Sequence, residues 1–489
     1  MTSETSLLVN LSLSEGSSTP FYVMPPGLFS LAAYLRENQV STDFLDFNIV
    51  KKKNADSSDS KLVSIFEDHL AESKPCLVGA SVMVAGQFKL ARETLKSTKK
   101  FSTDTVTVVG GAHVSQFPKE ILENCQEIDF VVMGEGESQL LACSHYARTK
   151  KFPSVWPDGI AYRSNGKIVV KPRSMYVENV DALPFPAYDL VEFDDYFHDT
   201  STWHNPYKVD LGVRVPIITS RGCPYLCNFC SIAKHMGRRY RPMSSVKVVD
   251  MMQMLQENHN VHYFAIFDAN FAQKTDRVIE ICNEINRRNL KCYIDLPTGL
   301  PINSFTKEMI DALANVGLIR TCISIETGDA NIRNYVMKKN VKQDDIFTVV
   351  EVIRHYPQIF LLTDFVLGMP EDTLESLEAT CELLASLDTD DITLSIATPY
   401  PGTALYRQWE SDKLFCNEGD KEKLWMADWY THANTNKFLI KPYELDIDTL
   451  KRYRDRILSF RASKILSYHK RMKTVFNVDS NYRRDLIQE

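Results

Sequence analysis

Residues 220–230 read SRGCPYLCNFC and place three cysteines, Cys223, Cys227 and Cys230, at C-x3-C-x2-C spacing. The apolar run before them, residues 215–219, predicts a strand, so the thiols fall on the loop at its carboxyl end. Three thiolates this close together can bind a soft metal centre. A structural zinc ion usually takes four ligands, and His235 is the nearest candidate for a fourth. A [4Fe–4S] cluster on three thiolates leaves one iron open. Three reduced structural cysteines, or zinc with His235, are the alternatives.

Outward from this segment, residues 213–410 alternate apolar runs with amphipathic stretches. The apolar runs predict six strands, at 215–219, 262–267, 291–296, 320–325, 360–367 and 391–397. Helical periodicity lies between them, for example at 244–258, 275–288, 307–316 and 374–386. This alternation predicts a partial (β/α)6 barrel with its chemistry at the carboxyl ends of the strands. Residues 411–489 lack the alternation and predict a mainly helical C-terminal region.

Residues 1–150 also alternate apolar runs with amphipathic stretches. Continuously apolar strands are predicted at 7–11, 42–47, 76–84, 105–109 and 129–133, with amphipathic helices between them. This pattern predicts a doubly wound, Rossmann-like α/β domain. Residues 151–212 predict a linker that contains a β-hairpin, because Asn165-Gly166 between two β-rich runs is a type I′ turn signal. Pro184 and Pro186 exclude a regular helix later in this linker.

The composition excludes several classes of protein. The chain has 489 residues, a formal charge of −7 and 11 cysteines, most of them isolated in the sequence. A mildly acidic chain is not a general nucleic-acid binder. Isolated cysteines in a chain of this length favour a reducing compartment, so we expect a cytoplasmic protein. No apolar stretch reaches 18 residues and the N-terminus lacks a cationic signal, so we expect no membrane span.

The cysteine motif, with Phe229 directly before the last thiol, resembles that of the radical S-adenosylmethionine (SAM) superfamily. The resemblance covers residues 213–406 and includes FDANF at 267–271, ISIETG at 323–328, LGMPEDT at 367–373 and TPYPGT at 398–403. The second of these segments resembles the family's G-x-E-S-G, with Ser324 in place of the first glycine and Thr327 in place of the serine.

This resemblance implies that the three cysteines hold a [4Fe–4S] cluster whose open iron binds SAM. An electron from a donor such as flavodoxin or ferredoxin then cleaves SAM to a 5′-deoxyadenosyl radical. The resemblance also implies cofactor contacts from Phe229, Asp268, Asn270 and Glu326. From the residues alone, Glu326 could instead pair with a neighbour such as Arg320. Asp268 and Asn270 could equally form a turn or a helix N-cap.

Two glycine-bearing turns follow predicted strands in the N-terminal region: GGAH at 110–113 and GEGE at 134–137. They lie at carboxyl ends of strands, where doubly wound sheets bind ligands, and glycine permits close approach. Neither is G-x-G-x-x-G or a P-loop, so nicotinamide or ATP binding is not indicated. The candidate contacts are Gly110, Gly111, His113, Gly134, Glu135 and Gly136.

These turns resemble the cobalamin-binding domain that precedes many radical SAM enzymes, over residues 7–147. The D-x-H-x-x-G motif of some cobalamin proteins is absent, and the nearest equivalent reads Asp46-Phe-Asn48. No histidine ligand of cobalt is therefore assigned. His113 is a pocket residue at most, or a polar loop residue. Ser81 could contact the cobalamin tail or be a plain buried serine. A degenerate scaffold without a corrin is the alternative for this domain.

Together the two regions imply a cobalamin-dependent radical SAM methyltransferase. In such an enzyme one SAM methylates cob(I)alamin, and a second generates the radical that activates an unactivated carbon of a small, biosynthetic substrate. The domain pair also resembles oxidative ring cyclases of tetrapyrrole synthesis and ring-rearranging enzymes without methyl transfer. A non-catalytic iron–sulfur protein is a further alternative. RNA-modifying methylthiotransferases are disfavoured, because Cys76, Cys125 and Cys143 occur singly.

Two features of residues 411–489 leave alternatives open. The Lys- and Arg-rich segment from residue 451 could meet an anionic substrate or partner, or form a solvated helix face. Upstream side chains could cap the active site or pack this region against the barrel; they are Trp425, Trp429, Tyr430 and His432.

Overall fold

The computed structural model describes residues 4–13, 23–54, 58–197, 204–417, 419–426 and 437–484. The chain forms two compact units. The N-terminal unit comprises Met1–Tyr196 together with Lys234–Met236 and Lys421–Tyr430, and the remaining residues form the C-terminal unit. Within the described ranges, no helix combines the length and the apolar character that a membrane span requires.

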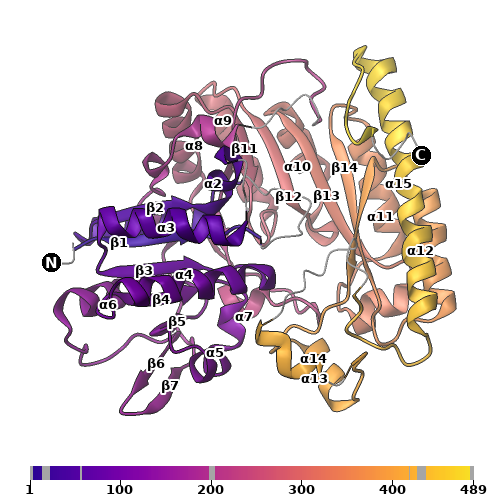
Figure 1. Ribbon diagram of the computed structural model, residues 1–489. Helices are drawn as coiled ribbons and strands as arrows, with labels where there is room; N and C mark the ends of the chain where they lie inside the picture. Colours follow the sequence, from indigo (N-terminus) through magenta and orange to yellow (C-terminus); the bar gives the residue numbers. More distant parts are fainter. Residues whose placement is uncertain are drawn as a thin grey trace. The chain divides into compact units, whose positions relative to one another are not determined.

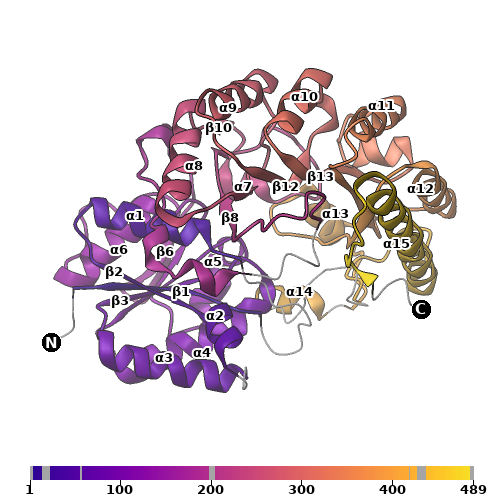
Figure 2. The same cartoon turned by 90° about the horizontal axis from the view of Figure 1, so that it is seen from above.

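The N-terminal unit is built on a seven-stranded sheet with the order β2-β1-β3-β4-β5-β6-β7, whose first five strands are parallel. The parallel strands are β1 (Ser6–Asn10), β2 (Thr42–Asp46), β3 (Leu77–Ser81), β4 (Val106–Gly110) and β5 (Phe130–Val132). The helices are α1 (Pro26–Glu37), α2 (Phe47–Lys53), α3 (Asp59–Ser73), α4 (Phe88–Phe101), α5 (Pro118–Asn124) and α6 (Glu137–Thr149). Helices α1 and α6 cover one face of the sheet, and α3 and α4 cover the other (Figure 2). The predicted doubly wound α/β fold is therefore confirmed.

The strand order locates the ligand edge of this sheet. The chain passes from β1 outward to β2 and then returns to β3 on the other side of β1. This change of direction makes the gap between the carboxyl ends of β1 and β3 the topological switch point, where doubly wound sheets bind ligands. Every residue of β1 is buried, as both faces of a covered parallel sheet require.

The hairpin predicted around Asn165-Gly166 is present, as β6 (Ile160–Ser164) and β7 (Lys167–Lys171). Both turn residues have positive φ, 49° for Asn165 and 73° for Gly166, as a type I′ turn requires. Strand β6 pairs antiparallel with β5, so the hairpin lengthens the N-terminal sheet. The Asn165-Gly166 turn could be predicted because its signal is local in the sequence. The pairing of β6 with β5 has no such local signal.

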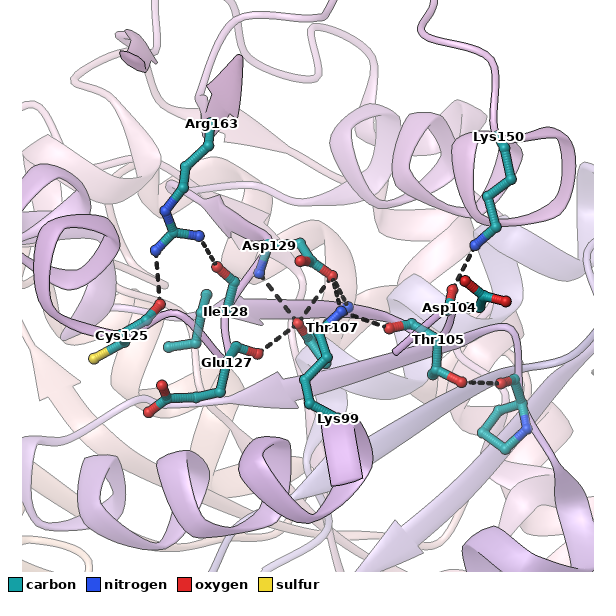
Figure 3. Close-up of polar contacts among 11 residues, drawn as sticks. Lys99, Asp104, Thr105, Thr107, Cys125, Glu127, Ile128, Asp129, Lys150 and Arg163 are labelled. Carbon is teal, nitrogen blue, oxygen red and sulfur yellow. Dashed lines mark hydrogen bonds and ion pairs between the residues drawn. The ribbon is translucent and has the colours of Figure 1, made fainter. Parts of the chain in front are cut away.

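The amino edge of this sheet is closed by hydrogen bonds (Figure 3). Lys99 Nζ on α4 lies 2.6 Å from Asp129 Oδ2, and the same oxygen accepts from the backbone N–H of Thr107 at 2.9 Å. Arg163 on β6 donates to the carbonyl oxygens of Ile128 and Cys125, each at 2.7 Å, and so satisfies the backbone after α5. Polar groups at this edge are thus hydrogen-bonded to one another.

The C-terminal unit is built on a six-stranded parallel sheet with the order β15-β14-β13-β12-β11-β8. Its strands are β8 (Arg214–Ile217), β11 (Tyr263–Ile266), β12 (Tyr293–Leu300), β13 (Leu318–Glu326), β14 (Phe360–Leu367) and β15 (Asp391–Ile396). The helices between them are α8 (Ser245–His259), α9 (Thr275–Arg287), α10 (Lys307–Asn315), α11 (Gln343–Arg354) and α12 (Leu374–Ser386). These helices form a layer along one side of the curved sheet (Figure 2). The predicted partial (β/α)6 barrel is confirmed.

The C-terminal region is mainly helical, as predicted. Its helices are α13 (Ala404–Ser411), α14 (Asp420–Lys423) and α15 (Ile447–Phe476), which stands beside α12 in Figure 1. On α15, Arg461 donates to both carboxylate oxygens of Asp391 at 2.8 Å, and Arg471 lies 2.5 Å from Asp390. Both aspartates are 1% exposed. Part of the basic segment therefore pairs with buried carboxylates of the barrel, a role that neither a solvated face nor an anionic partner describes.

Candidate active site and cofactor sites

The loop that carries the three cysteines is closed at its base and anchored in its middle. Strand β9 (Ser220–Arg221), before the cysteines, pairs antiparallel with β10 (Arg241–Pro242), after them. Between the second and third cysteines, the Asn228 N–H donates to Met337 O at 3.3 Å, and Asn228 O accepts from the Leu405 N–H at 3.0 Å. The loop is thus tied both to the segment after β13 and to the start of α13.

Burial governs the chemistry of the thiols on this loop. It raises the pKa of Cys223 and of Cys227, and it raises the pKa of Cys230 to about 11. The negative charges of its two neighbours raise the pKa of Cys230 further. Three thiolates here therefore need a cationic partner, which suits an iron–sulfur cluster. Among the described residues, no three His, Cys, Asp or Glu side chains are gathered as a metal site.

Asp268, at the end of β11, is engaged with the start of this loop. Its carboxylate accepts hydrogen bonds from Thr219 N at 2.5 Å, from Thr219 Oγ1 at 2.6 Å and from Ser220 Oγ at 2.6 Å. Arg277 on α9 donates to Thr219 O at 2.8 Å. Asp268 is completely buried, so it positions the residues that lead into the cysteine loop. A direct contact of Asp268 with SAM stays a prediction that these hydrogen bonds do not support.

Asn270, unlike Asp268, has a side-chain acceptor atom without a hydrogen-bond partner in the described chain. Its Nδ2 donates to Gln273 Oε1 at 2.6 Å, and its side chain also forms a hydrogen bond with Cys223. The Oδ1 atom is buried and has no partner within the described chain. An unsatisfied acceptor beside a cluster thiol fits a cofactor that presents an N–H donor, such as the amino group of SAM. Phe229 is half-buried on the same loop, and its predicted contact with SAM is untested.

Glu326 ends β13 with a φ of 74°, a left-handed conformation that a non-glycine residue rarely adopts. Its Oε1 lies 2.8 Å from Lys339 Nζ. The charges of Glu326 and Cys227 raise the pKa of Lys339, so this lysine is cationic. Glu326 thus pairs with a neighbour, as the alternative expected, but the partner is Lys339; Arg320 lies 3.7 Å from Asp295 instead. A strained backbone and a buried ion pair therefore coincide at this strand end.

Sequence reasoning missed two charged residues at this end of the barrel, Lys339 and Asp364. Asp364, on β14, accepts hydrogen bonds from Cys322 Sγ and Ser324 Oγ, both at 3.1 Å. Burial raises the pKa of its carboxyl group. The available signal was that Asp364 interrupts the apolar run of residues 359–369, which a strand in a covered sheet would otherwise not do. No local pattern singled out Lys339.

At the carboxyl edge of the N-terminal sheet, the loops after β3 and β4 lie against each other. Gly111 has a φ of 112°, and a Cβ there would come within 2.5 Å of Val82 O. The His113 N–H donates to the same carbonyl oxygen at 3.2 Å. Gly110 has ordinary space around it. The Ser81 hydroxyl is half-buried and makes no hydrogen bond to any described residue, so it can still receive a ligand.

His113 is enclosed by aromatic rings. Its ring lies 5.7 Å from that of Phe88 and 5.3 Å from that of Phe117, and Nε2 lies 3.0 Å from Trp425 O. Burial lowers its pKa to about 4, so the imidazole is neutral at pH 7. Trp425 therefore packs within the N-terminal unit, whereas Trp429, Tyr430 and His432 lie outside the described residues.

The loop after β5 is held by the protein itself. Arg173 donates through Nε to Met133 O at 2.7 Å and also to Glu135 O. The Glu135 carboxylate accepts from the Val177 N–H at 2.8 Å, so this side chain contacts the chain after the hairpin, and a corrin contact is not supported. A Cβ on Gly136 would come within 3.2 Å of Leu31, so this glycine serves packing against α1.

Asp46, in the segment nearest to a cobalt-ligand motif, is also engaged. It caps α2 by accepting from the Asn48 N–H at 2.8 Å, and it accepts from Asn10 Nδ2 at 3.0 Å and from Tyr196 Oη at 2.6 Å. Asp46 is the last residue of β2, and its carboxylate caps the helix that follows.

Comparisons with known proteins match both units. Residues 16–144 match the B12 binding domain family, and residues 217–384 match the radical SAM superfamily. The chain is 29% identical over 385 residues to the uncharacterized methyltransferase PH0819 of Pyrococcus horikoshii, covering 78% of this chain and 77% of the relative. It is 25% identical over 439 residues to an anaerobic magnesium-protoporphyrin IX monomethyl ester cyclase of Rubrivivax gelatinosus, covering 89% and 72%. In fold it resembles the radical SAM methyltransferase TsrM of Kitasatospora setae, with a TM-score of 0.66, 19% identity and coverage of 82% and 75%.

Proposed function

We propose that this protein, a member of the cobalamin-dependent radical SAM enzymes, methylates an unactivated carbon of a small-molecule biosynthetic substrate. Its cofactors are a [4Fe–4S] cluster, SAM and cobalamin. When bound, these groups supply radical generation and a methyl carrier, while the protein supplies binding, orientation and exclusion of water. The observation that carries the proposal is the presence of both cofactor domains in one chain, together with a methyltransferase relative that spans 78% of it.

Residues of the barrel would bind the cluster and SAM. Cys223, Cys227 and Cys230 would hold the cluster. Asn270 would accept a hydrogen bond from the SAM amino group, since its Oδ1 has no other described partner. Glu326, paired with Lys339, would orient the cofactor at the end of β13. Such fixed groups lower the barrier by holding the reacting atoms together.

A second candidate function is oxidative cyclisation or ring rearrangement without methyl transfer. It is favoured by the cyclase relative, whose match covers 89% of this chain. Product analysis separates the two. Methylation forms S-adenosylhomocysteine together with 5′-deoxyadenosine, whereas cyclisation or rearrangement forms 5′-deoxyadenosine alone.

The first experiment is anaerobic purification with iron, sulfide and corrin quantification. About four irons and one corrin per chain are expected. Cys227→Ala should lose the iron and keep the corrin, whereas Cys381→Ala, at a buried thiol of α12, should keep both. A wild-type protein that takes up no iron contradicts the proposal.

The electron donor is a flavodoxin or ferredoxin, the substrate is not a nucleic acid, and the compartment is the cytoplasm, because an oxygen-sensitive cluster requires reducing conditions. SAM cleavage supported by reduced flavodoxin or ferredoxin tests the first point. Retention of the protein on nucleic-acid columns at physiological salt would contradict the second. Fractionation of cells that express the protein tests the third.

A further inference from the structure

His235 is a buried histidine with an unsatisfied ring. It lies on α7 (Ile232–Met236), is 8% exposed, and neither Nδ1 nor Nε2 has a hydrogen-bond partner in the described chain. Burial lowers its pKa to about 4, so the ring is neutral at pH 7 and offers one donor and one acceptor. A buried polar group without a hydrogen-bond partner destabilises the folded chain. A ring in this state indicates that a ligand group belongs beside it.

The surroundings of His235 are those of the B12-binding domain. Lys234–Met236 belongs to the N-terminal unit, and a Cβ on Gly134 would come within 2.6 Å of His235 O. The Gly134 N–H in turn donates to Ser115 Oγ at 3.0 Å. The next residue, Gln116, has a buried Oε1 without a partner in the described chain. The two segments that carry these unsatisfied side chains, residues 115–116 and 234–236, therefore both contact Gly134. Gly134 lies at the carboxyl edge that binds ligands in this fold.

The chemistry of this pair selects its ligand. Gln116 Oε1 is an acceptor and needs a donor, which a carboxylate does not have. A neutral imidazole offers one donor and one acceptor. A primary amide satisfies both side chains, because its NH₂ donates and its carbonyl oxygen accepts. The corrin ring of cobalamin carries acetamide and propionamide side chains of this kind around its edge.

We propose that His235 and Gln116 form an amide-binding subsite for a corrin acetamide or propionamide of cobalamin. This inference rests on the cobalamin dependence of the proposed function. His235 follows Cys230 by five residues. The segment after the cysteine loop therefore serves the corrin, and His235 is not a fourth metal ligand. His235 is a positioning residue for the cofactor.

The test is a titration of the full-length protein, purified anaerobically, with hydroxocobalamin, followed by the corrin absorption. His235→Leu and Gln116→Leu are each expected to raise the Kd by about tenfold, the loss of one satisfied hydrogen bond. The double variant should raise it by less than the product of the two effects, because both side chains bind one amide. His235→Gln restores a donor and an acceptor and should recover most of the affinity.

A chemical probe and a control sharpen this test. The wild type should bind hydroxocobalamin more tightly than corrin monocarboxylates in which one propionamide is hydrolysed, and His235→Leu should reduce that preference for at least one of them. His145→Leu, at an exposed histidine of α6, should leave the Kd unchanged. Unchanged Kd values in both Leu variants overturn the subsite. Loss of iron in His235→Leu overturns it too, in favour of a metal ligand. A wild type that binds no corrin overturns the proposed function and the subsite together.

Discussion

Lys339 Nζ lies 2.8 Å from Glu326 Oε1, and both side chains are largely buried where β13 ends. Burial raises the pKa of Cys227, and the charge of Lys339 offsets part of that rise. One cation therefore pairs with a carboxylate and also acts electrostatically on a thiol of the cysteine loop. It compensates negative charge that the site would otherwise hold without a partner.

Lys339→Met should make the reduction potential of the cluster more negative. A nearby positive charge stabilises the reduced, more negatively charged state of a cluster, and methionine removes it at similar length. A redox titration followed by electron paramagnetic resonance measures the shift. Lys338→Met, at the exposed neighbouring lysine, is the matched control and should not move the potential. Equal potentials in Lys339→Met and the wild type would exclude this role.

Asp268→Ala should weaken retention of the cluster by about 10- to 100-fold, the usual effect of removing a group that orients a metal-binding loop. The alanine leaves Thr219 N, Thr219 Oγ1 and Ser220 Oγ without their acceptor. Iron that stays bound during a chelator challenge measures the effect. Asp276→Ala, at an exposed aspartate in the first turn of α9, should behave as the wild type. Normal retention in Asp268→Ala would show that the loop holds its shape unaided.

Arg461→Met should lower the free energy of unfolding by about 3 kcal/mol, because it leaves the buried Asp391 without its cationic partner. Arg456→Met removes a similar pair with Glu378, in which the two side chains are 48% and 43% exposed. That exposed pair should contribute less than about 1 kcal/mol. Urea denaturation of both variants checks the contrast, and equal losses would contradict the burial argument.

The stability of the protein without cofactors should fall as the pH drops from 6.5 toward 4, in part because of His113. Its pKa is about 4 in the folded state and near 6.5 when unfolded, so only the unfolded chain binds a proton in this range. The contribution is about 3 kcal/mol at pH 4. His113→Phe, which keeps an aromatic ring between Phe88 and Phe117, should show a smaller loss between pH 7 and pH 5 in denaturant melts. An unchanged pH slope would contradict the assignment.

Most elements could be predicted because their signals are local. The apolar runs of β14 and β15 and the periodicity of α12 gave strand and helix bounds that agree with the structure to within one residue. Helix α2 was missed because Phe47–Lys53 contains three lysines and no sustained apolar period. Strand β12 extends to Leu300, beyond the predicted end at 296, because its pairing with β13 resumes after a register shift.

The site could be predicted only where its residues are neighbours in the sequence. The three cysteines share one loop, so their spacing alone indicated a cluster. Glu326 was singled out by its motif, but its partner Lys339 lies beyond the strand, and nothing local indicated the pair. Glu135 looked free to meet a ligand, whereas its carboxylate contacts Val177 after the chain has returned from the hairpin. The predicted cofactor contacts of Ser81, Phe229 and Asn270 stay predictions.

The hydrogen bond between His113 Nε2 and Trp425 O joins residues 312 positions apart within the N-terminal unit. During synthesis on the ribosome, the strands and helices up to residue 196 emerge long before Trp425 does, so the aromatic surroundings of His113 stay incomplete until Trp425 has been synthesised. A fragment that ends at residue 196 would therefore lack Trp425, whose carbonyl oxygen contacts His113. Cofactor loading of this unit in the cell should therefore follow the synthesis of Trp425.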